Sequence, residues 1–245
     1  ECIAIDEFRG NAGGEKFQCN IADPVKHQVI DILPSRNTEN LCKHFLEYPY
    51  KERAAVKKIV MDLSTLFRSV AKTIFPEAKI VADKFHVIRV VINSLENVRK
   101  RIQKEFHATK RKWFKRSRYL LLKPEYKLTD EDKTELARML NSSYDLEKAY
   151  VLKERFYEVF RKQTRTEAKK ELGKWLLLAA DLSLPEFRHC ITTFSNWKTE
   201  IANIIGERVS NGFIEGSNNK IKVLKRISYG VQNFDRFRNR ILYLQ

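Results

Sequence analysis

Paired cysteines, long apolar runs and a signal-peptide pattern are all missing from this sequence of 245 residues. The four cysteines are scattered and none belongs to a CxxC pair, which excludes a zinc ribbon and a dithiol redox motif. No apolar stretch approaches the roughly 18 residues that a membrane span needs. We therefore expect a soluble, cytoplasmic protein without a membrane segment.

Negative charge is the scarcer sign: 47 Lys and Arg stand against 31 Asp and Glu, which gives a formal net charge of +16. Hydrophobic residues make up 43% and aromatic residues 11%, so the chain is globular and not a disordered basic tail. Such a balance favours a polyanionic partner, either nucleic acid or an anionic membrane. The basic region described below has no clean lipid-facing stripe, so nucleic acid is the better prediction.

Three short apolar runs each end on an aspartate, namely Asp6, Asp62 and Asp83. Each run has the length and the continuous apolar character of a strand that is buried on both faces of a parallel sheet. Ligands of open α/β sheets bind at the edge where such strands end, and carboxylates gathered there repel one another unless cations compensate them. The pattern therefore predicts a divalent-metal site.

An α/β core opens the chain. The pattern predicts strands at 2–8, 16–22, 28–33, 56–61 and 79–82, with a helix near 41–46 and another from Ser64 to Pro76. The first three strands form an antiparallel meander. The 245 residues fit one large domain that carries an insertion. Because the first residue is not methionine, we expect the chain to be an excised portion of a longer protein.

Glycine nearly vanishes between residues 87 and 205, where long helical patterns replace the strand pattern. We predict an all-helical insertion over 87–205. It would divide an α/β core into a first part, 1–86, and a C-terminal part, 206–245, with helices at about 211–226 and 234–244.

The helix predicted at 211–226 is unusually polar. On a 3.6-residue spacing Glu215, Asn219, Lys222 and Arg226 share one face, with Lys225 beside it. The acid could ligate a metal, and the cations could hold neighbouring phosphates. A solvated helix face is the alternative, but glycines at 212 and 216 cost about 1 kcal/mol each and call for a reason such as close backbone approach.

The single aspartates are ambiguous, because an aspartate after a strand is commonly a turn or cap residue. The coincidence of Asp6 and Asp62 at matching strand ends with Glu215 on a polar helix favours a site. Asp83, His86 and Asn219 are second-tier candidates, since a lone histidine at a helix start is more often a packing or capping residue.

A basic cluster with interleaved aromatic residues occupies 99–118. Its ten Lys and Arg stand against one acid, which is typical of a surface that holds a phosphate backbone, although a charge run is usually only a solvated face. No motif for reading bases accompanies it, so it would position nucleic acid without reading its sequence. The cluster consists of Arg99, Lys100, Arg101, Lys104, Lys110, Arg111, Lys112, Lys115, Arg116 and Arg118.

Four stretches form a recognisable set, namely Asp6 within 5–8, Asp62 within 61–64, the segment 81–87, and the segment 211–222 followed by Arg226 and Tyr229-Gly230. Together they resemble the bacterial IS-L-three family of insertion-sequence DDE transposases along essentially the whole chain. The resemblance implies a ribonuclease-H-like core that is interrupted by a helical insertion. It also implies that Asp6, Asp62 and Glu215 are the catalytic triad.

The resemblance further implies cleavage of double-stranded DNA at transposon ends and strand transfer to target DNA, with Mg²⁺ as cofactor and Mn²⁺ as a substitute. A homodimer and a nucleoid-associated location in a bacterial cytoplasm belong to the same expectation. Family members usually carry an N-terminal zinc-binding and helix-turn-helix region, so the resemblance concerns the catalytic core. Two alternatives stay open: a ribonuclease-H-like nuclease or resolvase without strand transfer, and a non-catalytic, domesticated DNA-binding protein.

Overall fold

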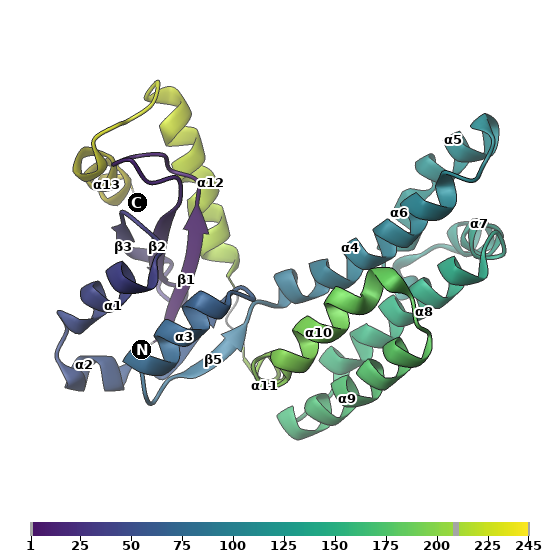
Figure 1. Ribbon diagram of the computed structural model, residues 1–245, viewed down its shortest axis with the longest axis horizontal. Helices are drawn as coiled ribbons and strands as arrows, with labels where there is room; N and C mark the ends of the chain where they lie inside the picture. The colour runs from purple at the N-terminus through teal and green to yellow at the C-terminus, as the bar shows by residue number, and fades with distance from the viewer. Residues whose placement is uncertain (1, 208–210, 245) are drawn as a thin grey trace. The chain divides into compact units, whose positions relative to one another are not determined.

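The computed structural model describes residues 2–207 and 211–244, and the chain divides into two compact units (Figure 1). The first unit contains Glu1–Lys84 and Glu207–Gln245, and the second contains Phe85–Gly206. The first is mixed α/β and the second is helical, so the predicted α/β class is confirmed. None of the helices in the described ranges combines the length and the apolarity that crossing a bilayer requires.

The first unit is built on a five-stranded mixed sheet. Its strands are β1 (Cys2–Phe8), β2 (Gln18–Asp23), β3 (Gln28–Leu33), β4 (Lys58–Met61) and β5 (Lys79–Ala82), in the order β3-β2-β1-β4-β5. The first three strands are antiparallel, as predicted, and β4 and β5 run parallel to β1. The carboxyl ends of β1, β4 and β5 therefore meet at one edge of the sheet.

Helices cover both faces of this sheet. On one face, α12 (Gly212–Ile227) and α13 (Phe234–Tyr243) pack Ile214, Ile221, Phe237 and Ile241 against Ala4 and other sheet residues. The side chains next in sequence along the strands point to the opposite face. Three further helices, α1 (Thr38–Leu46), α2 (Tyr50–Ala55) and α3 (Thr65–Ile74), belong to this unit, and α3 packs on α1 and on β4.

The helix boundaries follow from local chemistry. The Ser64 hydroxyl accepts a hydrogen bond from the Phe67 amide and begins α3 where the sequence predicts it. The Asn37 side chain caps α1 in the same way, which starts that helix earlier than its apolar residues indicate. The sequence does not predict α2, because this helix buries none of its residues and so carries no apolar periodicity.

The second unit is helical throughout its described residues. Its helices are α4 (Lys84–Gln103), α5 (Ala108–Arg116), α6 (Arg118–Leu122), α7 (Asp130–Leu140), α8 (Tyr144–Tyr157), α9 (Arg165–Asp181), α10 (Arg188–Asn196) and α11 (Lys198–Ala202), with short 3₁₀ turns at Glu125–Lys127, Glu158–Arg161 and Pro185–Phe187. The rings of Phe156, Trp175 and Phe194 form its centre, with centroids 5.0 to 5.6 Å apart. Aromatic packing of this kind contributes to the stability of a helical unit.

Candidate functional site

Two of the predicted acids lie side by side at the carboxyl edge of the sheet. Ile5 pairs with Met61 across the parallel strands β1 and β4, so Asp6 and Asp62 are the next residues on neighbouring strands. Strands are about 4.8 Å apart, which sets the scale of their separation. Both side chains are half-buried.

Asp83 lies at the same edge, one strand further along. It follows β5, and its amide donates a hydrogen bond of 2.7 Å to the Met61 carbonyl. Its side chain is 3% exposed, and Oδ1 accepts a hydrogen bond of 3.3 Å from the Asn211 amide at the start of α12. The Asp83 side chain therefore contacts the beginning of this helix.

Negative charge accumulates at this edge. Burial raises the pKa of the Cys19 thiol on β2 well above its usual value, and the charges of Asp6, Glu7 and Asp62 raise it further. Glu7 is partly compensated by an ion pair with the Arg36 guanidinium. The thiol is thus held neutral, and the acids that act on it form a local field that favours cations.

The helix α12 is tied to Asp6 through Asn218. The amide nitrogen Nδ2 of Asn218 donates a hydrogen bond of 2.8 Å to Asp6 Oδ2, and Asn218 is 3% exposed. Its Oδ1 accepts a hydrogen bond of 2.8 Å from Nδ2 of Asn20, which lies opposite Asp6 on β2. A buried helix residue and two strands therefore meet at one carboxylate.

The spacing of these contacts places Glu215 near the end of β4. Asn211 lies at β5 and Asn218 at β1, and seven residues of helix rise about 10 Å, which is close to two strand spacings. Glu215 is four residues after Asn211 and three before Asn218, so all three share one stripe of the helix. The backbone of Glu215 consequently lies between the two fixed points, level with the strand that carries Asp62.

The Glu215 side chain itself is exposed. Among the residues that the structure describes, no three His, Cys, Asp or Glu side chains lie close enough together to hold a metal ion. The structure thus brings Asp6 and Asp62 together and places the Glu215 stripe beside them, without gathering the three carboxylates into one ligand group.

The other residues of α12 and its surroundings fall into two sets. Lys222 and Arg226 are exposed, and Lys222 Nζ donates a hydrogen bond of 3.5 Å to the exposed Asn219. Burial lowers the pKa of Lys225, and the charge of Arg9, just after β1, lowers it further, so these two cations lie near each other. Positive charge therefore flanks the acidic edge. His86, the histidine predicted as a second-tier candidate, belongs to α4 in the second unit.

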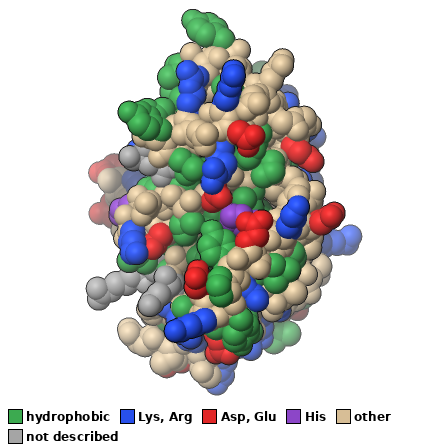
Figure 2. Space-filling view, turned by 90° about the vertical axis from the view of Figure 1, so that its left-hand side faces the viewer, with side chains coloured by type: hydrophobic (Ala, Val, Ile, Leu, Met, Phe, Trp, Pro, Cys, Tyr) green, Lys and Arg blue, Asp and Glu red, His purple; other side chains and the backbone are tan. Residues whose placement is uncertain are grey.

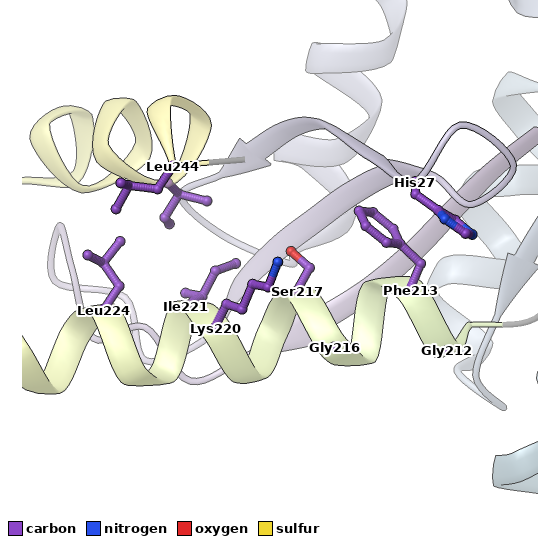
Figure 3. A pocket seen from close by; sticks show the side chains of 10 residues that line it. His27, Gly212, Phe213, Gly216, Ser217, Lys220, Ile221, Leu224 and Leu244 are labelled. Carbon is purple, nitrogen blue, oxygen red and sulfur yellow. The ribbon is translucent and has the colours of Figure 1, made fainter.

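Gly216 of α12 does not serve the close packing that the sequence suggests. A Cβ added at Gly216 would meet no atom within 4 Å, so this face of the helix borders open space. Figure 3 shows the cavity there, of about 400 Å³, between α12, Leu244 and the turn that carries His27. The His27 ring stacks on Phe213 at 5.3 Å, and the cavity lies on the side of α12 that faces away from Glu215.

The basic cluster of the second unit is divided between internal ion pairs and solvent. Arg99 is 4% exposed and bonds Glu96, which Arg118 also bonds at 2.6 Å. Burial raises the pKa of Glu96, but the hydrogen bonds and charges of these two arginines hold it below its usual value. Arg101 pairs with Glu186 and Asp145 at 2.7 and 2.9 Å. These three guanidinium groups stabilise the helices.

The remaining members of the cluster face solvent or lie at the surface, and they are Lys100, Lys104, Lys110, Arg111, Lys112, Lys115 and Arg116. The interleaved aromatic residues are packing residues. Phe114 is fully buried, and the Trp113 indole donates a hydrogen bond to Glu135. On the face of the molecule in Figure 2, by contrast, basic and acidic side chains are interspersed.

The protein is of the α/β class. It has a mixed sheet with acids at one edge, and a polar helix is hydrogen-bonded to residues at that edge. Over residues 3–241 the chain matches the model of a family described as "Transposase". It belongs to the IS-L-three family of insertion-sequence DDE transposases, which confirms the resemblance found in the sequence.

Named relatives agree with this assignment. The chain is 26% identical over 241 residues to the transposase for insertion sequence element IS1001 of Bordetella parapertussis, covering 97% of this chain and 59% of that protein. It is 27% identical over 254 residues to the transposase for insertion sequence element IS1557 of Mycobacterium tuberculosis, covering 94% of this chain and 57% of that protein. The chain thus spans somewhat more than half the length of these relatives.

A shorter match has a different name. The chain is 35% identical over 94 residues to an ATP-dependent protease of Lactococcus lactis, covering 38% of this chain and 26% of that protein. This partial match carries no argument about the activity of the chain.

Proposed function

We propose that the chain is the catalytic core of an insertion-sequence transposase, which cleaves phosphodiester bonds at transposon ends and joins them to target DNA. The observation that carries the proposal is the pairing of Asp6 and Asp62 at the sheet edge, with Asn218 tying the Glu215 helix to the first of them. The strand order, three antiparallel strands followed by two parallel ones, supports a ribonuclease-H-like core. The helical unit would then be an insertion before the last acid.

Asp6, Asp62 and Glu215 are the residues that would hold two Mg²⁺ ions, for which Mn²⁺ can substitute. Their donor set fits the cation, because Mg²⁺ prefers carboxylate oxygens. The acids at this edge also create a negative electrostatic potential. Glu215 would join the aspartates by rotation of its exposed side chain. When bound, such ions activate a water or a 3′-hydroxyl and stabilise the leaving oxygen.

The chain's own cations would hold the DNA in line for attack. Lys222, Lys225 and Arg226 follow Glu215 on α12 and would contact phosphates next to the reacting one. The exposed lysines and arginines of the second unit would contact the backbone elsewhere. Because these contacts are to phosphates, they would position double-stranded DNA without selecting its sequence.

A second candidate is a DNA-binding protein that has kept the fold without catalysis. The exposed Glu215 and the lack of a three-carboxylate group among the described residues favour it. A third, a nuclease without strand transfer, would use the same acids.

Substitution of the acids tests the proposal. We expect Asp62→Asn and Glu215→Gln to abolish Mn²⁺-dependent cleavage of double-stranded DNA and joining of pre-cleaved ends, and to leave DNA affinity equal or higher because each removes a charge that repels phosphate. Asp130→Asn, at an exposed acid in the first turn of α7, is the matched control and should cleave normally. Cleavage retained by both site variants would refute the assignment, and cleavage without joining would identify a nuclease.

A further inference from the structure

A buried asparagine interrupts the most enclosed strand of the sheet. All six residues of β2 are buried, and Asn20 in the middle of the strand is 0% exposed. Burying an amide costs free energy unless its groups are hydrogen-bonded, and a branched apolar residue would pack there without that cost. The Asn20 side chain therefore needs an explanation beyond the stability of the strand.

The donors of this amide are directed at α12. Its Nδ2 donates to Asn218 Oδ1 at 2.8 Å and to Ser217 Oγ at 3.2 Å, whereas its Oδ1 has no hydrogen-bond partner among the described residues. In this orientation both hydrogen bonds are made by Nδ2 of Asn20. Because Asn218 accepts one of them through its Oδ1, its own Nδ2 is directed toward Asp6. Asn20 thus determines which atom Asn218 presents to the carboxylate.

The Asp6 carboxylate is held from two directions. Its Oδ1 accepts a hydrogen bond of 2.8 Å from the Glu7 amide, and its Oδ2 accepts the bond of 2.8 Å from Asn218. An ionised carboxylate oxygen has two lone pairs and can accept a hydrogen bond and ligate a cation at the same time. The two donors therefore orient the Asp6 carboxylate.

We infer that Asn20 and Asn218 form a positioning relay, in which the hydrogen bonds Asn20 to Asn218 to Asp6 set both the orientation of Asp6 and the height of Glu215 above the sheet. The inference rests on the proposed function, because it concerns the metal affinity of that site. Asn218 follows Glu215 by three residues on the same helix stripe, so its position fixes the glutamate backbone as well. Partners that orient ligands commonly account for about 10- to 100-fold in metal affinity.

Titration of the 245-residue protein with Mn²⁺ alone, followed by calorimetry, tests the relay. We expect Asn218→Ala to weaken Mn²⁺ binding about 10- to 100-fold and Asn20→Ala to weaken it less, because Asn20 acts through Asn218. The double variant should bind no more weakly than Asn218→Ala, since the second change removes nothing that remains coupled. Raising the Mn²⁺ concentration should restore DNA cleavage in each single variant.

A purely structural role is separated by a control of similar kind. The Asn233 side chain caps α13 by accepting a hydrogen bond from the Arg236 amide, so Asn233→Ala should lower the melting temperature and leave Mn²⁺ affinity unchanged. If circular dichroism shows that Asn218→Ala is unfolded, Asn218→Leu, which keeps the volume and removes the donor, takes its place.

Wild-type Mn²⁺ affinity in a folded Asn218 variant would overturn the relay, as would losses that simply add in the double variant. The proposed function fails separately: Asp6→Asn and Glu215→Gln would then bind Mn²⁺ as the wild type does. Weakened binding in the acid variants together with unchanged binding in the asparagine variants would keep the function and reject the relay.

Discussion

The two units bury polar groups for different purposes. In the second unit, the buried Lys153 donates hydrogen bonds to the carbonyls of Leu121 and Lys123, at the end of a neighbouring helix, and Arg99 pairs with Glu96 one turn away. Each group satisfies helix ends or a neighbour on its own helix. In the first unit, by contrast, the buried amide of Asn20 on β2 donates to Asn218 on α12, and Asn218 donates to the Asp6 carboxylate at a sheet edge. Neutral amides that lead to a carboxylate at a strand end indicate a site, whereas ion pairs and satisfied helix carbonyls indicate stabilisation.

The largest effect on stability is expected from the aromatic centre of the second unit. Trp175→Ala removes a ring that packs on Phe156 and Phe194 and the indole hydrogen bond to the Leu152 carbonyl. We expect a loss of about 3–5 kcal/mol in the free energy of unfolding, measured by denaturant titration. Mn²⁺ affinity of the folded fraction should not change. A metal-binding defect in that fraction would break the distinction between the units.

Glu96→Gln should have a somewhat smaller effect that depends on pH. It leaves the buried Arg99 without its carboxylate, which we expect to cost about 2–4 kcal/mol at neutral pH. Because the folded-state pKa of Glu96 is lowered, its stabilisation is present above the ordinary value of 4.5 and is lost as the pH falls through the folded-state pKa. Unfolding free energies of wild type and variant should therefore approach each other in acid. A gap that is constant with pH would show that packing, not charge, is responsible.

The smallest effect is expected from single exposed cations of the basic cluster. Lys112→Ala should weaken binding to double-stranded DNA of any sequence and reduce the slope of log affinity against log salt by about 0.9. Lys133→Ala, at an exposed lysine paired with Asp130 on α7, is the matched control and should leave the slope unchanged. Fluorescence anisotropy at several salt concentrations measures both. Equal slopes for Lys112→Ala and wild type would remove this residue from the DNA-binding surface.

A residue's role can be predicted from the sequence when it depends on a local pattern. It cannot be predicted when it depends on contacts in the folded chain. Strands that end on Asp6 and Asp62 are predictable, because continuous apolar runs and strand-end acids are local patterns. The helix α2 is not, since it buries no residue and its sequence carries no periodicity. Nor does the sequence predict that Phe114 is buried, because a ring beside lysines looks the same in sequence whether it is buried or exposed.

The site shows the same limit. The acids and the polar helix could be selected from residue type, but Asn20 and Asn218 could not, because their meaning lies in a contact across 198 residues of chain. The available signal was a polar residue between Cys19 and Ile21 in the middle of a strand. Neutral amides attract less notice than carboxylates, although here they are the more deeply buried groups.

The match between seven helix residues and two strand widths makes one stretch of the chain intolerant of length change. One residue added between Asn211 and Asn218 would turn everything beyond it by about 100° and lift it by about 1.5 Å, so both anchors could not be kept. The long helical segment between the two parts of the first unit is not held to this spacing. Variation in length should therefore collect in that segment and stop abruptly at Asn211.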